Sequence, residues 1–174
     1  MTECKSSVAL IGLPGSGKST TGVLLAKRLS QQFVDTDLLI QVREARALQQ
    51  ILDVDGVAAL RRIEAEVISQ LDVQRTLVAT GGSAVYGGAA MQALKAQCVV
   101  CYLEVTEAIM LQRLGDFSQR GIAMPPGFTL PDMYRERVPL YERYADFAVD
   151  ATQPTEEVVS AIAELLAKRH DFSF

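Results

Sequence analysis

The stretch GLPGSGKST, residues 12–20, decides the fold expected for this chain. Its letters fit the pattern G-x-x-x-x-G-K-[ST], in which glycines let the backbone curl around an anion. Successive N–H groups then point inward at the start of a helix, where the helix dipole also favours negative charge. The stretch therefore predicts a phosphate-binding loop, although a Gly-rich turn could give the same letters by chance. The residues that match the pattern are Gly12, Gly17, Lys18 and Ser19.

The sequence on both sides of this loop has the pattern that such a site requires. An apolar run, SVALIG at 7–12, predicts a buried strand before it, and apolar residues at helical spacing follow over 19–31. Lys18 is expected to reach the β- and γ-phosphates of a nucleotide, and the Ser19 hydroxyl is expected to bind Mg²⁺. The sequence has no N/T-K-x-D element of the kind typical of guanine-specific proteins, which favours ATP. The residues predicted to hold the nucleotide are Gly15, Ser16, Gly17, Lys18, Ser19 and Thr20.

The composition is that expected of an ordinary soluble protein. It has 174 residues, of which 49% are hydrophobic and 22% charged, and this size fits one domain over 1–174. A net charge of -4 argues against a general nucleic-acid or membrane surface, which would need a basic excess. The apolar stretches fall far short of the roughly 20 residues of a membrane span. The first residues, MTECKSS, lack the apolar core of a signal peptide, so a cytoplasmic location is expected.

Three cysteines and one histidine limit the chemistry available. Cys98 and Cys101 lie in a strand-like run, where residues three apart point to opposite faces and cannot easily share a metal. They are expected to be buried apolar side chains, and Cys4 stands apart from them. His170 ends a predicted helix, where its charge complements the dipole. A catalytic base is therefore sought among the carboxylates.

Five short apolar strands alternate with helices along the chain. This order predicts an α/β fold: a three-layer sandwich with a five-stranded parallel sheet and helices on both faces. Residues 114–132 are too rich in Gly, Pro and polar residues for a core element, and a loop of that length is usually functional or disordered. The expected strands are 7–12, 31–35, 76–80, 98–105 and 146–150. The expected helices are 19–31, 38–53, 57–72, 88–96, 106–114, 131–145 with a break near Pro139, and one after Thr155.

Two aspartates in FVDTD, residues 33–37, follow the second predicted strand. Ligands of open parallel sheets bind beyond the carboxyl ends of the strands, where Gly81 and Gly82 also lie. Extended backbone would put Asp35 and Asp37 on one side, with one near Mg²⁺ and the other near an acceptor hydroxyl. The alternative is an Asx-turn or an N-cap for the next helix.

The chain resembles the shikimate kinases, small ATP-dependent enzymes related to the nucleoside monophosphate kinases. GLPGSGKST, FVDTD, LRRIEAEVI, TGGSAV, the loop residue Arg120 and RVPLYERYADFAVD occur in the order and spacing of that family. The resemblance extends from about Val8 to Leu166. It implies a P-loop NTPase fold with an acceptor-binding helical region at about 36–66 and a mobile lid at about 112–128. It also implies a monomer that transfers phosphate from ATP to the 3-hydroxyl of shikimate, giving shikimate 3-phosphate.

The resemblance assigns a role to each candidate residue. It implies that Asp35 meets Mg²⁺ through water, and that Asp37 grips the acceptor hydroxyls and takes the proton. A carboxylated acceptor needs fixed cationic forks, which arginine supplies, although solvated helix faces would carry similar arginines. The residues assigned to the acceptor are Asp37, Arg61, Gly81, Gly82 and Arg137, and the lid residue assigned to the phosphates is Arg120.

Several positions depart from the family pattern. Ser83 replaces the third glycine and fits only if its φ is negative, in which case its hydroxyl can add a contact. The lid reads RGIAMPPG over 120–127 instead of an arginine-proline-leucine-leucine run. Two alternatives therefore stay open: a related kinase for another small hydroxy acid or polyol, and a nucleotide-binding paralogue with little activity. The altered pocket positions are Leu52, Val57, Leu60 and Ser83.

Overall fold

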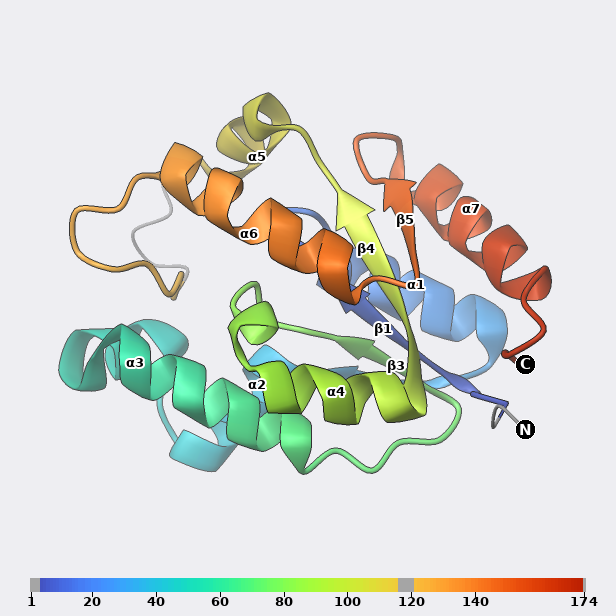
Figure 1. Cartoon of the computed structure of the whole chain (residues 1–174), viewed down its shortest axis with the longest axis horizontal. Coiled ribbons are helices and arrows are strands. Elements are labelled where there is room, and N and C mark those ends of the chain that lie inside the picture. Colours follow the sequence, from blue (N-terminus) through green and yellow to red (C-terminus); the bar gives the residue numbers. More distant parts are fainter. Residues whose placement is uncertain (1–3, 116–120, 174) are drawn as a thin grey trace.

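A computed structural model of the chain describes residues 4–115 and 121–173. Five parallel strands form one sheet in the order β2-β3-β1-β4-β5 (Figure 1). β1 lies at the centre, paired with β3 on one side and with β4 on the other. The five-stranded parallel sheet expected from the sequence is confirmed. The strands are β1 (Ser7–Ile11), β2 (Gln32–Asp35), β3 (Thr76–Ala79), β4 (Cys98–Glu104) and β5 (Phe147–Asp150).

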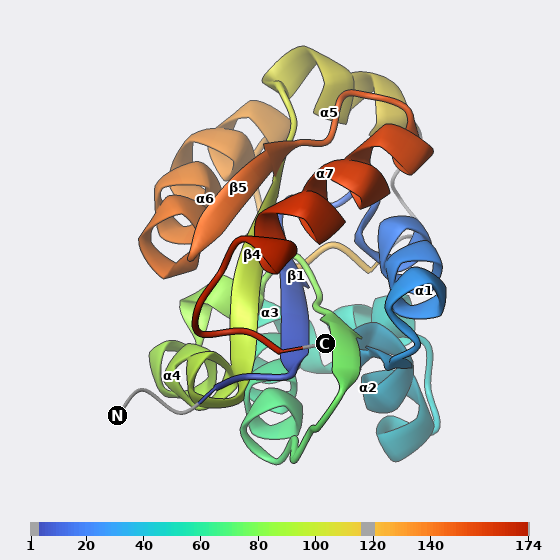
Figure 2. The same ribbon diagram turned by 90° about the vertical axis from the view of Figure 1, so that its right-hand side faces the viewer.

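Helices cover both faces of the sheet, as the sequence predicts. α1 and α7 pack together on one face, while α3, α4 and α6 lie on the other (Figure 2). Within the part of the chain that the structure describes, no helix is both long and apolar enough to cross a membrane. The helices are α1 (Lys18–Leu29), α2 (Thr36–Glu44), α3 (Leu48–Ser69), the 3-10 helix η1 (Ala84–Tyr86), α4 (Gly88–Gln97), α5 (Glu107–Leu114), α6 (Leu130–Tyr144) and α7 (Thr155–Ala167).

The two central strands carry the main core. All five residues of β1 are buried, as are the first six of β4. Cys98 and Cys101 lie fully buried in this core, which confirms their apolar role, and burial raises the pKa of both thiols. Cys4 is exposed. Because β1 and β4 are tightly packed in this core, they hold in place the first residues of the loops that follow them.

The helical region after β2 differs from the expectation in one place. The sequence predicts one helix over 38–53, but α2 ends at Glu44 because Ala45 takes a left-handed backbone with φ 50°. α3 then starts at Leu48 and is kinked at Gly56, whose φ of 83° lies outside the helical range. The split expected near Asp55 and Gly56 is thus confirmed, and the turn at Ala45 is an additional break that apolar spacing does not reveal.

The break expected near Pro139 is wrong, because α6 runs continuously through this residue. A proline inside a helix removes one backbone hydrogen bond and costs about 3 kcal/mol. Here, buried residues on both sides of it, including Met133 and Tyr141, hold the two halves of α6 against the core. Their packing offsets the lost bond.

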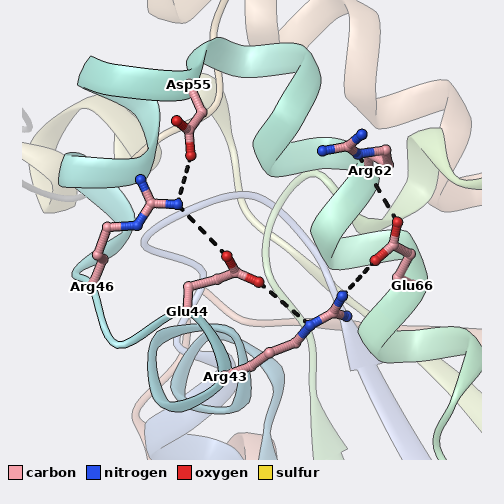
Figure 3. A network of polar contacts seen from close by, with 6 residues as sticks. All are labelled: Arg43, Glu44, Arg46, Asp55, Arg62 and Glu66. Carbon is pink, nitrogen blue, oxygen red and sulfur yellow. Dashed lines mark hydrogen bonds and ion pairs between the residues drawn. The ribbon is translucent and has the colours of Figure 1, made fainter.

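A chain of ion pairs joins α2 to both halves of α3 (Figure 3). Arg43 pairs with Glu66 at 2.6 Å, and Arg46 pairs with Asp55 at 2.6 Å. Glu44 lies between the two arginines, at 3.4 Å from Arg43 and 3.6 Å from Arg46. Exposed pairs of this kind each contribute at most about 1 kcal/mol. Their effect is to fix the turn between the two helices rather than to stabilise the whole fold.

Candidate active site

The loop between β1 and α1 wraps around the side chain of its own lysine. Lys18 Nζ donates hydrogen bonds to the carbonyl oxygens of Gly12 and Leu13, each at 2.8 Å, and to Ser16 Oγ at 3.4 Å. Gly17, immediately before it, has a φ of 95°, which strongly favours glycine. Burial lowers the pKa of Lys18 to about 8, although the Asp37 carboxylate opposes this shift. A buried cation at a helix N-terminus has the chemistry of a phosphate site.

The first aspartate of the pair is the N-cap that the sequence offers as one alternative, and it also contacts the predicted magnesium ligand Ser19. Asp35 Oδ1 accepts a hydrogen bond from Asp37 N at 2.9 Å, and Asp35 is thereby the N-cap of α2. Its other oxygen, Oδ2, accepts a hydrogen bond from Ser19 Oγ at 2.6 Å. The sequence predicted extended backbone through both aspartates, with the two side chains on one side of the strand. This is wrong, because helix α2 begins between them at Thr36. Asp37 instead reaches the site from the first turn of that helix.

The oxygen atoms of Ser19 and Asp35 fit a magnesium ion that is bound together with a nucleotide. Mg²⁺ takes oxygen ligands and usually keeps waters and substrate phosphates alongside only one or two protein groups. Within residues 4–115 and 121–173, no group of three or more His, Cys, Asp or Glu side chains is arranged to hold a metal. The fit therefore depends on phosphate oxygens beside the Lys18 loop.

A cavity of about 440 Å³ opens in front of this loop, beyond the carboxyl ends of β1, β2 and β3. Its wall includes the phosphate loop, α2, both halves of α3, the turn after β3, Gly121 to Ala123, and Arg137 of α6. Most of the predicted site residues meet here, including Lys18, Asp37 and Arg137. The volume suits a small molecule next to the end of a nucleotide.

Glu64 lies in the candidate site, although no role was predicted for it from the sequence. It lies in the cavity wall at 2% exposure, and Ser83 Oγ donates a hydrogen bond to its Oε2. Burial is the main cause that raises its pKa to about 7, and Asp37 adds to the shift. Helical spacing could have located it, because Leu60, Ile63, Glu64 and Val67 form one buried stripe on α3.

Asp37 faces the same space as Glu64, on either side of Gly81. A Cβ on Gly81 would collide with Glu64 Oε1 and lie 2.6 Å from Asp37 Oδ1, so any side chain there would displace both carboxyl groups. Burial raises the pKa of Asp37 to about 6; the Asp35 carboxylate adds to the shift, and Lys18 opposes it. A carboxylate with a pKa near neutrality is suited to accept a proton from a hydroxyl.

The two predicted arginines occupy different places. Arg137 lies in the cavity wall at 1% exposure, and its Nη2 donates to the carbonyl oxygen of Ala123 at 2.5 Å. Arg61 is not among the cavity-lining residues, and its guanidinium lies 3.7 Å above the ring of Tyr86. Among the described residues, its buried Nε and Nη2 find no hydrogen-bond partner. Gly82 leaves room for Arg137, since a Cβ there would lie 3.2 Å from Arg137 Nη1.

A second hollow of about 240 Å³ continues from the phosphate loop on its other side. Gly15, Ser16, Gly17 and Thr20 line it together with residues from the loop between β5 and α7, and with Arg113 of α5. This hollow is where the remainder of a nucleotide would extend from the loop. Arg113 and Gln153 are not among the residues predicted from the sequence, because no local motif marks them.

Of the predicted lid at about 112–128, residues 112–115 and 121–128 are described, and Arg120 lies outside the described residues. Gly121 N donates to Gln49 Oε1 of α3 at 3.1 Å. Ala123 is buried at 3% exposure in a small apolar cluster with Ile40 and Leu60. The described end of the predicted lid thus packs on the predicted acceptor-binding region.

The fold and this site define a class of protein, a P-loop phosphotransferase with a small acceptor pocket beside its phosphate loop. The family model for shikimate kinase matches residues 14–167. The chain therefore belongs to the shikimate kinase family.

Individual relatives agree with this assignment. The chain is 34% identical to the shikimate kinase of Vibrio parahaemolyticus, over 95% of this chain and 98% of that protein. It is 32% identical to shikimate kinase 2 of Yersinia enterocolitica, over 92% and 95%. The solved structure of Acinetobacter baumannii shikimate kinase in complex with shikimate matches with a TM-score of 0.87 at 27% identity, over 95% of this chain and 94% of that one. The Aquifex aeolicus shikimate kinase structure gives 0.79 at 30% identity, over 92% and 96%.

Proposed function

We propose that this protein transfers the γ-phosphoryl group of ATP to the 3-hydroxyl of shikimate. The observation that carries the proposal is the single cavity onto which the phosphate loop, Asp37 and Arg137 all open. Phosphoryl transfer depends on holding donor and acceptor in line and on neutralising charge, and these residues supply both. Family membership and the shikimate-bound relative support the identity of the acceptor.

On the donor side, the backbone from Gly15 to Thr20 cradles the phosphates and Lys18 neutralises their charge. For this, Lys18 Nζ exchanges its bonds to the loop carbonyls for bonds to phosphate oxygens. Ser19, and Asp35 through water, would hold Mg²⁺, which would neutralise phosphate charge when bound. Arg120 supplies a further positive charge to the phosphates, an assignment that rests on its position in the sequence.

On the acceptor side, Asp37 accepts the proton from the attacking hydroxyl. Its raised pKa keeps it a better base than an exposed aspartate while it remains ionised near neutral pH. Gly81 and Gly82 let the acceptor approach the backbone closely. Arg61 and Arg137 hold the acceptor carboxylate, because a guanidinium binds a carboxylate through two parallel hydrogen bonds.

A related acceptor is the second candidate, and the cavity wall is the observation that favours it. Ile40, Leu48 and Leu60 line the cavity, and Leu60 is one of the positions that depart from the family pattern. An altered apolar contact changes discrimination by about 1–3 kcal/mol, which is enough to admit a neighbouring hydroxy acid. The arginines restrict these candidates to carboxylic acids.

An ADP-release assay with a coupled readout separates these candidates. Purified protein with ATP and Mg²⁺ is offered shikimate, quinate or gluconate in turn, and a Lys18→Ala variant controls for contaminating kinases. We expect saturable ADP release with shikimate and a much lower kcat/KM with the other two acids. Turnover of quinate or gluconate without turnover of shikimate would replace the proposed acceptor. ATP binding without turnover of any acid would instead support a nucleotide-binding paralogue.

A further inference from the structure

One tyrosine ring contacts both predicted arginines of the site. Tyr86 ends η1, three residues after Ser83, and is half-buried. The guanidinium carbon of Arg61 lies 3.7 Å from the centre of its ring, and that of Arg137 lies 5.4 Å from it. Two cations therefore share one aromatic ring, with Arg61 coming from α3 and Arg137 from α6.

The hydroxyl of the same tyrosine forms hydrogen bonds with two residues of α6. Arg137 Nε donates a hydrogen bond to Tyr86 Oη at 3.4 Å, and the hydroxyl donates to Glu136 Oε1. Burial and the bond to Glu136 raise the pKa of Tyr86, so the hydroxyl remains a donor at neutral pH. Together with the ring contacts, these bonds restrict the rotation of both guanidinium groups.

The arrangement also explains how two like charges can be neighbours before an anion is bound. The face of an aromatic ring carries partial negative charge, and a nearby cation is attracted to it. The negative charge of Glu136 lies at the hydroxyl end of the ring. On Arg61, the buried Nε and Nη2 lie on the same edge of the guanidinium and have no partner among the described residues. This edge has the geometry of a fork for a carboxylate.

We propose that Tyr86 is a positioning residue that orients Arg61 and Arg137 toward the carboxylate of the acceptor. The inference rests on the proposed function, because it assigns that carboxylate to the two arginines. Tyr86 acts through the arginines and does not itself line the acceptor cavity. Its loss frees both side chains to adopt other rotamers, and binding must then order them again.

The test compares Tyr86→Leu, which removes ring and hydroxyl, with Tyr86→Phe, which keeps the ring. Tyr134→Leu is the matched control, because Tyr134 is also half-buried and outside the acceptor cavity, but it is not the ring that Arg61 and Arg137 contact. Steady-state kinetics are measured with shikimate, with ATP and with the neutral methyl ester of shikimate. We expect Tyr86→Leu to raise the KM for shikimate about tenfold while the KM for ATP changes less than about twofold. Tyr86→Phe should recover most of this loss.

The acid-to-ester comparison identifies the carboxylate as the group concerned. If Tyr86 positions the arginines, Tyr86→Leu lowers the ratio of kcat/KM for acid over ester, whereas a structural defect lowers both values alike. An unchanged ratio overturns the inference. A lower KM for shikimate in Tyr86→Leu also overturns it, because it would mean that the ring keeps Arg61 away from the acceptor. If wild type uses quinate or gluconate instead of shikimate, the proposed acceptor fails alone and the variants are compared on that acid. If it uses none of the acids, both proposals fail.

Discussion

Glu64→Gln is expected to stabilise the protein above about pH 7 and to leave its stability almost unchanged near pH 5. Glu64 is almost completely buried, and burial is the largest cause of its raised pKa. Asp37 raises the pKa further, whereas the hydroxyl of Ser83, Arg137 and Lys18 lower it. The native state therefore holds this proton more tightly than the unfolded state does.

The sign and size of the effect follow from this difference in proton affinity. The pKa of Glu64 rises from 4.5 in the unfolded chain to about 7 in the folded one. Between these values the folded protein keeps a proton that the unfolded chain has lost, so the free energy of unfolding falls as pH rises. At 1.36 kcal/mol per pKa unit, the stabilisation present below pH 4.5 decreases by about 3 kcal/mol at pH values well above 7.

Glutamine cannot ionise and keeps the shape of the protonated acid. Its carbonyl oxygen can still accept the hydrogen bond from Ser83, so at about pH 5 we expect a change within about 1 kcal/mol. At about pH 8 wild type carries a buried charge and the variant does not, and we expect the variant to be more stable by roughly 1–3 kcal/mol.

Urea unfolding followed by far-ultraviolet circular dichroism measures both proteins across this pH range. Glu164→Gln on α7 is the control, because Glu164 is exposed and its substitution should give a difference that does not vary with pH. A stability difference between wild type and Glu64→Gln that is the same at both ends of the range would refute the reasoning. A variant that loses stability as pH rises would refute it as well.

Three further substitutions test the site and the core. Asp37→Asn should lower turnover by about 10²–10⁴-fold while ATP affinity, measured by calorimetry, stays nearly intact; an equal loss of both contradicts its role as base. Arg120→Ala should lower kcat by about 10³-fold in the same assay, and an unchanged rate would mean that another residue supplies this charge. Gly22→Ala should lower the free energy of unfolding by about 1–3 kcal/mol, because a Cβ on Gly22 would lie 2.7 Å from the Phe33 ring and 2.8 Å from Leu77. Unchanged urea denaturation would show that these side chains yield without strain.

The fold could be predicted from the sequence because local patterns and topology agree. A buried strand, a glycine-rich turn and a helix around Lys18 admit few arrangements, and alternating strands with crossover helices require a parallel sheet. Local turns were harder to predict. Ala45 adopts a left-handed backbone although alanine is a strong helix former, so its conformation is imposed by the packing of α2 and α3. Pro139 shows the opposite case, in which packing keeps a helix intact where local chemistry predicts a break.

The site was predictable where residues adjacent in sequence share a function, and less so where the chain folds back. Asp35 and Asp37 lie two residues apart, and the pattern they form was visible, but only Asp35 has the expected extended backbone, because Asp37 lies in the first turn of α2. Glu64 and Tyr86 are separated by 22 residues, and each acquires its role from partners on other elements. A charged residue on the apolar stripe of a helix is the available signal for Glu64. The sequence carries no comparable signal for Tyr86, since a tyrosine after a short helical turn is ordinary.

Ser83 shows how a departure from the family pattern is accommodated. Its φ of -100° needs no glycine, which meets the condition set by the sequence. Its hydroxyl bonds to Glu64 inside the wall of the cavity. A glycine at this position would remove one of the interactions that lower the pKa of Glu64, and the acid would then hold its proton more tightly. The serine therefore influences the charge of the cavity as well as lining its wall, and shape alone does not determine which molecule fits.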